Sequence, residues 1–398
     1  MKKLLINLLA ISLISGTITA CSTGGGSSSG PSGPAAPSAS ELAPPAGSAL
    51  AGGTSGAAIN LSQNQIALPG ASAYVSYAMD PSVTAAIGPA VNAGTAIVAT
   101  SGNNILINVP SGDGLNTITY VLTPVATSGQ SQSLQATSTS FESYTYPAAE
   151  VTTNLLSTES ATVFPHGLVY GTAKSLVVLA PNTSGLSPVN FPISTCAGAT
   201  GSASAVYATV TQGTPYLSFG TSAGSVCVVS GADAKVTNLA TQAPAGKYTA
   251  GNVNSFGFPA TLNTGNSLVG YWNVGTVGSA VNVYRITGSY VNGQPTGNGF
   301  LNTTSPNPQT TTNGTTQVTF TNVPSTSMIN SSYVDASGNV WVGTTNGSVY
   351  VLRTGATAWT NTALSGQSGA VTVKYNGSTS GATAVAANAG GSVSFSLN

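Results

Sequence analysis

The stretch Tyr333–Leu352, with the sequence YVDASGNVWVGTTNGSVYVL, decides the fold of this chain of 398 residues. Val340–Val342 and Val349–Leu352 are short apolar runs typical of β-strands, and Thr345–Ser348 between them contains an Asn-Gly pair. That pair is the strongest short-range signal for a tight hairpin turn. Asp335–Asn339 forms a polar turn before the first run. The stretch therefore predicts a turn followed by a β-hairpin.

Weaker copies of this hairpin recur along the chain. They share a Gly-Thr pair, or a degenerate equivalent, followed by an apolar run, and they begin at Ala99, Gly171, Gly220, Gly275 and Ala386. With Gly343 marking the quoted stretch, the spacings between them are 72, 49, 55, 68 and 43 residues, of which the shorter ones suit a repeat of roughly 40 to 50 residues, the length that four short strands and their turns require. The longest gap, between the first two copies, predicts a further unit around Phe141–Val151.

The quoted stretch resembles the repeat of the two-component-regulator type of β-propeller. Blades of that type carry an Asp, a Gly-Asn pair, a Trp and a Gly-Thr pair, which match Asp335, Gly338-Asn339, Trp341 and Gly343-Thr344. Short alternating runs throughout the chain predict an all-β fold, and the resemblance implies a single β-propeller. The six copies, counting the quoted stretch, and the longest gap predict about seven four-stranded blades, with six or eight also possible. Tandem β-sandwich domains are the alternative, because irregular spacing and Gly-Ser hairpins suit them too.

The N-terminus has the layout of a secretory signal peptide. Lys2 and Lys3 precede a largely apolar run, Leu4–Ile14, which is too short to span a bilayer as a mature helix. The sequence Ile18-Thr-Ala-Cys21 resembles the lipobox of bacterial lipoproteins. The resemblance implies a signal peptide over residues 1–20, a lipid on Cys21 and an outer-membrane location, facing the periplasm or the cell surface. An ordinary signal peptide with a coincidental cysteine is the alternative.

Residues 21–57 are predicted to be the lipidated cysteine and a flexible tether. After Cys21 this segment is almost entirely Ser, Gly, Pro, Ala and Thr, and Glu41 is its sole charge. Such a composition cannot bury enough apolar surface to offset the entropy of ordering. The propeller is then expected over residues 58–398, with Ala58–Leu61 or Gln65–Leu68 closing the ring against Val393–Leu397.

The scarcity of charge excludes several classes of function. The chain has 8 Lys and Arg, 8 Asp and Glu and a single His, so only 4% of its residues are charged. A nucleic-acid partner needs a basic face, and a coiled coil needs charged flanks, so neither is expected. The sequence indicates no cofactor and no metal site.

Two cysteines remain after Cys21. An exported chain allows Cys196 and Cys227 to oxidise, and we predict a disulfide between them, with two buried reduced thiols as the alternative.

Catalytic groups are few and are not arranged in a known motif. His166 is the single imidazole, and no nucleophile-elbow sequence accompanies it. Glu142, Glu150 and Glu159 are close enough in sequence to suggest a glycosidase pair, but they lie in a Thr- and Ser-rich segment typical of a solvated loop. The sequence therefore favours a binding protein over an enzyme.

Aromatic residues near hairpin ends are the candidate ligand contacts. Tyr271, Trp272 and Trp359 could present a stacking platform, and the polar turn at Asp335 could line a binding funnel with them, although packing between blades is the competing interpretation. We predict a membrane-anchored, non-catalytic propeller that binds protein, peptide or glycan, as a scaffold, surface adhesin or coat component. The alternative is an exported propeller hydrolase or lyase acting on glycans.

Overall fold

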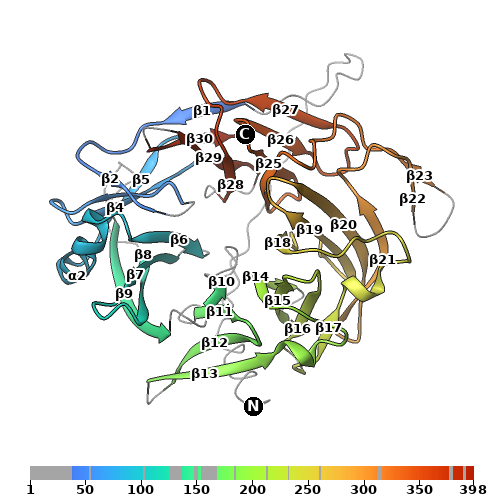
Figure 1. Ribbon diagram of the computed structural model, residues 1–398, viewed down its shortest axis with the longest axis horizontal. Coiled ribbons are helices and arrows are strands. Elements are labelled where there is room, and N and C mark those ends of the chain that lie inside the picture. The colour runs from blue at the N-terminus through green and yellow to red at the C-terminus, as the bar shows by residue number, and fades with distance from the viewer. Residues whose placement is uncertain are drawn as a thin grey trace.

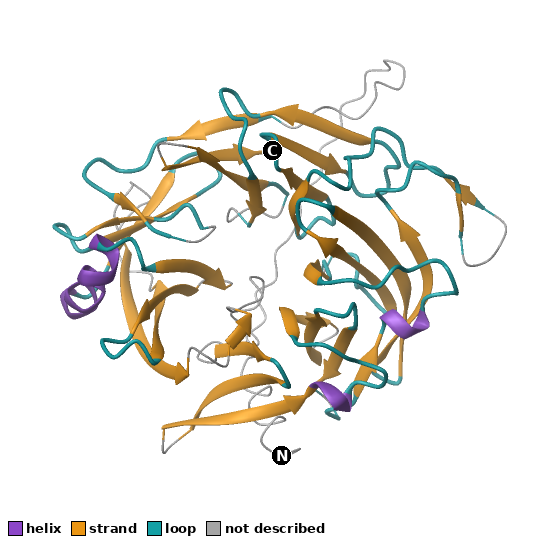
Figure 2. Cartoon of the chain, in the orientation of Figure 1, coloured by secondary structure: helices purple, strands orange, loops and turns teal. Residues whose placement is uncertain are grey.

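The chain forms a seven-bladed β-propeller whose four-stranded blades are arranged around one axis (Figure 1). The computed structural model describes residues 38–398 apart from 53–54, 102–103, 125–136, 148–150, 154–167, 183–184, 212–213, 232, 260, 312–315, 376–379 and 389–390. Nearly all of the regular structure is strand (Figure 2). The prediction of a single propeller is confirmed, and the tandem-sandwich alternative is not the fold.

In six blades the four strands follow one another along the chain, and the seventh is completed by the N-terminal strand. The blades are β2 (Ala49–Leu50), β3 (Ala58–Asn60), β4 (Gln65–Pro69) and β5 (Tyr74–Ala78); β6 (Ile97–Ser101), β7 (Asn104–Pro110), β8 (Asn116–Pro124) and β9 (Thr137–Pro147); β10 (Val151–Thr153), β11 (Leu168–Thr172), β12 (Ser175–Asn182) and β13 (Gly185–Pro192); β14 (Ala203–Thr211), β15 (Thr214–Thr221), β16 (Val226–Ser230) and β17 (Val236–Asn238); β18 (Val253–Gly257), β19 (Ser267–Thr276), β20 (Ala280–Val291) and β21 (Gln294–Asn302); β24 (Ile329–Val334), β25 (Val340–Thr344), β26 (Ser348–Leu352) and β27 (Trp359–Ala363); and β28 (Val371–Lys374), β29 (Ala382–Asn388), β30 (Gly391–Leu397) and β1 (Ala39–Leu42).

The connections between blades carry the remaining elements. Helix α2 (Pro81–Asn92) joins the first two blades, and the side chain of Asp80 caps its N-terminus by accepting a hydrogen bond from the Ser82 amide at 2.8 Å. The short strands β22 (Gln309–Thr310) and β23 (Gln317–Val318) pair between the fifth and sixth blades. The 3-10 turns η2 (Ile193–Thr195) and η3 (Ala240–Gln242) flank the fourth blade. Within the described residues, no helix has the length and apolar character needed to cross a membrane.

The ring is closed by a strand from the segment expected to be a tether. Strand β1 pairs antiparallel with β30, with Glu41 opposite Phe395, and the two strands lie side by side at the top of Figure 1. The prediction that Ala58–Leu61 or Gln65–Leu68 would close the ring was wrong, because these segments belong to the second and third strands of the first blade. β1 is the outermost strand of its blade, so most of its surface faces solvent and Leu42 is its one buried side chain. A strand in that position can therefore be formed by a largely polar and small-residue segment.

The predicted number of blades is confirmed, but the place of the additional blade was wrong. Phe141 lies in β9, the fourth strand of the second blade, and Val151 begins the third blade. The blade that the repeats did not reveal is the first one, β2–β5. The copy beginning at Ala99 is the hairpin between the first and second strands of its blade, whereas the other copies join second and third strands. This difference explains the long gap after Ala99.

The Gly-Thr pair has a structural role that repeats between blades. A Cβ atom on Gly343 would collide with the backbone carbonyl of Val371 in the next blade, so only glycine lets the blades approach this closely. The Thr344 hydroxyl accepts a hydrogen bond from the Ser348 amide at 3.0 Å and donates to the Ser348 carbonyl at 2.9 Å. The hydroxyl of Thr172 makes the same two contacts with Ser175. Glycine therefore packs the blades, and threonine closes the hairpin.

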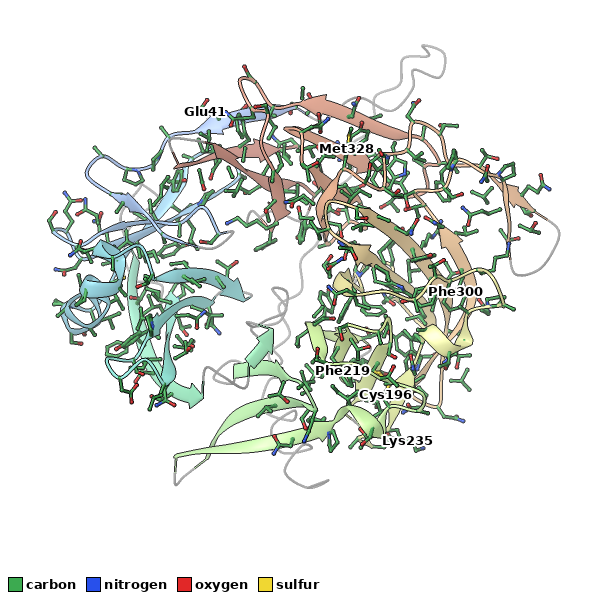
Figure 3. The ribbon with its side chains drawn as sticks, viewed as in Figure 1. Glu41, Cys196, Phe219, Lys235, Phe300 and Met328 are labelled. Atoms are coloured by element: carbon green, nitrogen blue, oxygen red, sulfur yellow. A yellow bond between two sulfur atoms is a disulfide. The ribbon has the colours of Figure 1, made fainter. Side chains whose placement is uncertain are left out.

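The hydrophobic core is divided into clusters between neighbouring blades. Cys196 and Phe219, for example, belong to one cluster between the third and fourth blades, and Phe300 belongs to another between the fourth and fifth (Figure 3). The contact between the seventh and first blades, which we call the closing seam, has a small apolar cluster of Leu42, Ala58, Ala67 and Tyr74.

Candidate functional site

The aromatic residues expected to form a platform are buried in the cores between blades. Tyr271 and Trp359 share the cluster between the fifth and sixth blades, and Trp272 lies on the opposite face of the fifth blade among other aromatic rings. The indole of Trp359 donates to the Thr303 carbonyl at 2.8 Å, which holds it in place. The expectation of exposure is therefore corrected: these side chains act in packing and offer no face to a ligand.

Asp335 is a fully buried hydrogen-bond hub. Its Oδ1 accepts from the Asn339 amide at 2.9 Å, and its Oδ2 accepts from the Asn339 side chain at 2.8 Å, the Trp341 indole at 2.9 Å and the Gly381 amide at 3.1 Å. The guanidinium of Arg353 lies 5.1 Å from the centre of the Trp341 ring, a cation–π arrangement. The carboxylate thus ties the sixth blade to the seventh and is not available to a ligand.

The predicted disulfide between Cys196 and Cys227 is present, with 6.1 Å between the Cα atoms. It joins the connection before the fourth blade to the third strand of that blade, and both cysteines are buried. It contributes to structure and presents no reactive thiol.

The acidic groups that can be placed have local tasks. Hydrogen bonds from Ser82 lower the pKa of the Asp80 carboxyl, and hydrogen bonds from Ser111 and the Leu115 amide lower that of Asp113. Asp233 forms an ion pair with Lys235 at 3.1 Å, a surface contact of small energetic value. Among the described residues, no three His, Cys, Asp or Glu side chains form a group that could hold a metal ion.

Several residues singled out by sequence lie outside the described residues. These are Cys21, Glu150, Glu159 and His166. Glu142 lies in β9, the fourth strand of the second blade.

The feature that the structure adds is a repeated bulge in the first strands of four consecutive blades. The pairing register shifts by one residue between Val151 and Thr153, Ala203 and Ala205, Val253 and Ser255, and Ile329 and Ser331. The extra residue in each case is polar: Thr152, Ser204, Asn254 and Asn330. Each shift lies opposite the end of the second strand, beside the hairpin to the third. Bulges re-aim side chains and are enriched beside functional sites.

Two of these side chains connect their blade to the next one around the axis. The Ser204 hydroxyl donates to the Val253 carbonyl of the next blade at 2.8 Å, and the Asn330 amide donates to the Val371 carbonyl at 2.9 Å. One residue beyond the bulge of the fifth blade, the hydroxyl of Ser255 lies 2.8 Å from that of Ser332 in the sixth.

We call these residues of the fourth, fifth and sixth blades the inner polar ring, and its half-buried members are Ser204, Asn254, Ser255, Asn330 and Ser332. All five are uncharged, and each can both donate and accept hydrogen bonds. The ring is therefore suited to hydroxyl and amide groups of a ligand rather than to ions.

The hairpins between second and third strands surround the same end of the axis. Their exposed tips include Ser222, Val277 and Asn346, and their charged residues are Asp113 and Lys174. The hairpins are fixed to the first strands, as in the hydrogen bond from the Thr345 amide to the carbonyl of Met328 at 2.8 Å. This hairpin end of the propeller therefore combines a rigid frame with a nearly neutral surface.

Sequence reasoning missed the inner polar ring because its signal is weak. Ser204, Asn254 and Asn330 stand in short runs that otherwise alternate apolar and polar residues, and a bulge changes which face each residue occupies. The sequence signal is a Ser, Thr or Asn at the second position of each of these first strands, 13 to 21 residues before a Gly-Thr pair or its equivalent.

Comparison with known proteins identifies no family for the chain. No family model and no curated protein matches its sequence. Solved structures with similar folds include the β-propeller domain of Cps50 (Swd1) from Myceliophteria thermophila, with a TM-score of 0.46 and 11% identity over 89% of this chain and 98% of that chain. The computationally designed Ika8 protein (TM-score 0.38, 12% identity, 73% of this chain and 67% of that chain) and the Dos1 propeller (0.38, 12%, 75% and 66%) are also similar. These similarities concern the fold alone.

Proposed function

We propose that this protein is a lipid-anchored propeller of the outer membrane that binds an uncharged ligand at its hairpin end, as a non-catalytic adhesin, coat component or scaffold. The observation that carries the proposal is the inner polar ring, a series of half-buried hydroxyl and amide groups on adjacent first strands. Neutral glycans and the backbone of extended peptides present the complementary groups. Of these, we favour a neutral glycan because the ring is rich in hydroxyl and carboxamide groups.

The proposed anchor follows from the sequence Ile18-Thr-Ala-Cys21 and from the position of the first strand. Strand β1 begins at Ala39, so a lipid on Cys21 would be joined to the ring by residues 22–38. A flexible chain of that length spans about 20–25 Å. The propeller would therefore act close to the membrane surface, and the tether is shorter than the sequence suggested.

The alternative of a glycan hydrolase or lyase is not favoured by a specific observation. Asp335 is enclosed by four donors, and Asp80 and Asp113 cap local backbone, so these carboxyl groups are already engaged. Loss of any measured glycan cleavage on replacing Glu142, Glu150 or His166 by Ala would favour the enzyme.

The binding proposal is tested with the full-length protein in detergent on arrays of neutral and acidic glycans, at low and high salt. We expect binding to neutral glycans that changes little with salt, because no ion pairs are involved. Asn330→Ala should weaken binding, and Asn361→Ala, on the fourth strand of the same blade, is the matched control. Binding only to acidic glycans, or equal effects of the two variants, would contradict the proposal.

The anchor is tested by metabolic labelling of cells with an alkyne fatty acid. The protein should acquire the label and Cys21→Ala should not, while Cys196→Ala, which removes another cysteine, should remain labelled. Protease shaving of intact cells then distinguishes a cell-surface from a periplasmic orientation. Absence of label from the unmodified protein would disprove lipidation.

A further inference from the structure

Lys374 is an unpaired amine at the inner edge of the closing blade. It is the last residue of β28, the first strand of that blade, and it is partly buried. No hydrogen bond or ion pair joins its amine to any residue in the described part of the chain. Desolvation lowers the pKa of the amine to about 7, so a large fraction of it is uncharged at neutral pH.

A polar row extends from Lys374 across the closing blade. Lys374 is opposite Thr383 in β29, Thr383 is opposite Ser396 in β30, and Ser396 is opposite Ser40 in β1. Directly opposite residues share a face of the sheet, with their Cβ atoms roughly 5 Å apart. The row is therefore continuous, and Lys374 is its one ionisable member.

Thr383 provides the second, independent observation. Its side chain is fully buried, and its hydroxyl oxygen has no hydrogen-bond partner in the structure. Buried hydroxyl groups nearly always have a partner, and leaving one without costs about 1–3 kcal/mol. Thr383 is the cross-strand neighbour of Lys374, so an unpartnered buried hydroxyl and an unpartnered amine belong to residues that are adjacent on one face of the blade.

The row faces the closing seam. The Tyr74 hydroxyl of the first blade donates to the Gly56 carbonyl at 2.8 Å and lies 3.3 Å from the hydroxyl of Ser394, on the same face as Thr383. Ser396 donates to the carbonyl of Ala71. The seam is thus held together by hydroxyl groups, which suits a polar adduct better than the apolar cores between the other blades.

The titratable groups beside Lys374 are phenols. Tyr375 follows it in the chain and interacts electrostatically with Tyr77 of β5. Desolvation, and then this neighbour, raise the pKa of the Tyr77 phenol above 10, so it is neutral near pH 7. No carboxylate in the described part of the chain interacts with Lys374. Nothing placed near the amine therefore stabilises its protonated form.

We propose that Lys374 is a covalent attachment site for small aldehydes, among which the open-chain forms of reducing sugars are one class. The uncharged amine forms a bond from its nitrogen to the carbonyl carbon, and the carbonyl oxygen takes up the proton that the nitrogen loses. The resulting carbinolamine then releases water to give an imine, with no change in oxidation state. The Thr383 hydroxyl donates a hydrogen bond to the carbinolamine oxygen. This site is separate from the inner polar ring and does not depend on the ligand proposed there.

The experiment traps the imine on the full-length protein. Glycolaldehyde and cyanoborohydride are added at pH 7.4, and the modified lysines are quantified by peptide mass spectrometry. Lys374 should be modified more than about ten-fold faster than Lys174, Lys235 and Lys247, because an ordinary lysine is only about 0.1% neutral at this pH. Modification of Lys374 at or below the rate of those three lysines would overturn the proposal.

Two further measurements test whether the reactivity of Lys374 depends on its uncharged amine and on the Thr383 hydroxyl. The rate at Lys374 in the unmodified protein should level off above about pH 7, whereas the rate at Lys235 should continue to rise up to pH 9. A rate at Lys374 that rises in parallel with that at Lys235 would contradict the proposal. Thr383→Val, which preserves shape, should slow trapping at Lys374 several-fold and leave the other lysines unchanged. An unchanged rate would remove the hydroxyl from the mechanism.

Discussion

Replacement of Asp335 by Asn should destabilise the fold, although the two side chains have nearly the same shape. Oδ2 accepts hydrogen bonds from the Asn339 side chain, the Trp341 indole and the Gly381 amide, whereas Oδ1 accepts from the Asn339 backbone amide. The new side chain therefore keeps its oxygen at the Oδ2 position and turns its NH2 group toward the Asn339 backbone amide, which loses its acceptor and faces another donor. At about 1–3 kcal/mol for a buried donor left without a partner, Asp335→Asn should cost about 1–3 kcal/mol.

The assay is urea unfolding followed by tryptophan fluorescence and by circular dichroism, with the midpoint compared at equal slope. Asp113→Asn is the matched control, because it removes the same charge from an exposed turn. The remaining amide oxygen can still accept from the Leu115 amide, so this variant should lose less than about 0.5 kcal/mol. The reasoning would be refuted by an Asp335→Asn variant whose unfolding free energy lies within about 0.5 kcal/mol of that control.

Three further outcomes follow from the packing of the ring. Gly343→Ala should lower stability by about 2 kcal/mol or more in thermal unfolding because its Cβ has no room beside the next blade, whereas Gly112→Ala, with open space around it, should have little effect. Leu42→Asp should expose β30 to hydrogen exchange by displacing the closing strand, while Ser40→Asp on the exposed part of that strand should not. Lys374 binds fewer protons folded than unfolded between pH 7 and 10, so the unfolding free energy should rise with pH by up to about 1.4 kcal/mol per unit; a Lys374→Met variant that keeps the whole slope would contradict this.

The sequence predicted the structure best in the sixth blade, where turn residues, alternating apolar runs and the Asn-Gly pair all indicate the same local structure. In Tyr333–Leu352, the turn, both strands and the Asn-Gly hairpin lie where their residues predict them. The number of blades followed from that unit and its copies. The first blade was missed because its strands are short: β3 has three residues and β2 has two, too few for an alternating pattern to be recognised.

Burial and partnership were the properties that sequence could not supply. The expected platform residues Trp272 and Trp359 stand near strand ends in the sequence, and only the neighbouring blades decide that they are enclosed. Asp335 was correctly placed in a turn, but three of its donors come from its own unit and the fourth, the Gly381 amide, comes from the next blade. The pairing of Lys374 with Thr383 likewise depends on a register that residues 375–381 alone do not specify.

Strand β1 lies between the proposed lipid anchor on Cys21 and the closing seam that carries Lys374. β1 has four residues, of which three are exposed, so its side chains bury little apolar surface. The ring is therefore closed mainly by the backbone hydrogen bonds between β1 and β30. The seam behind it has the small apolar cluster and a row of hydroxyl groups, whereas the neighbouring blades are joined by larger apolar clusters. A membrane anchor on Cys21 would therefore transmit any pull directly to the strand that closes the ring. Because Lys374 is on the face of the closing blade that packs against that seam, a covalent adduct there would alter the part of the propeller that is nearest in sequence to the proposed anchor.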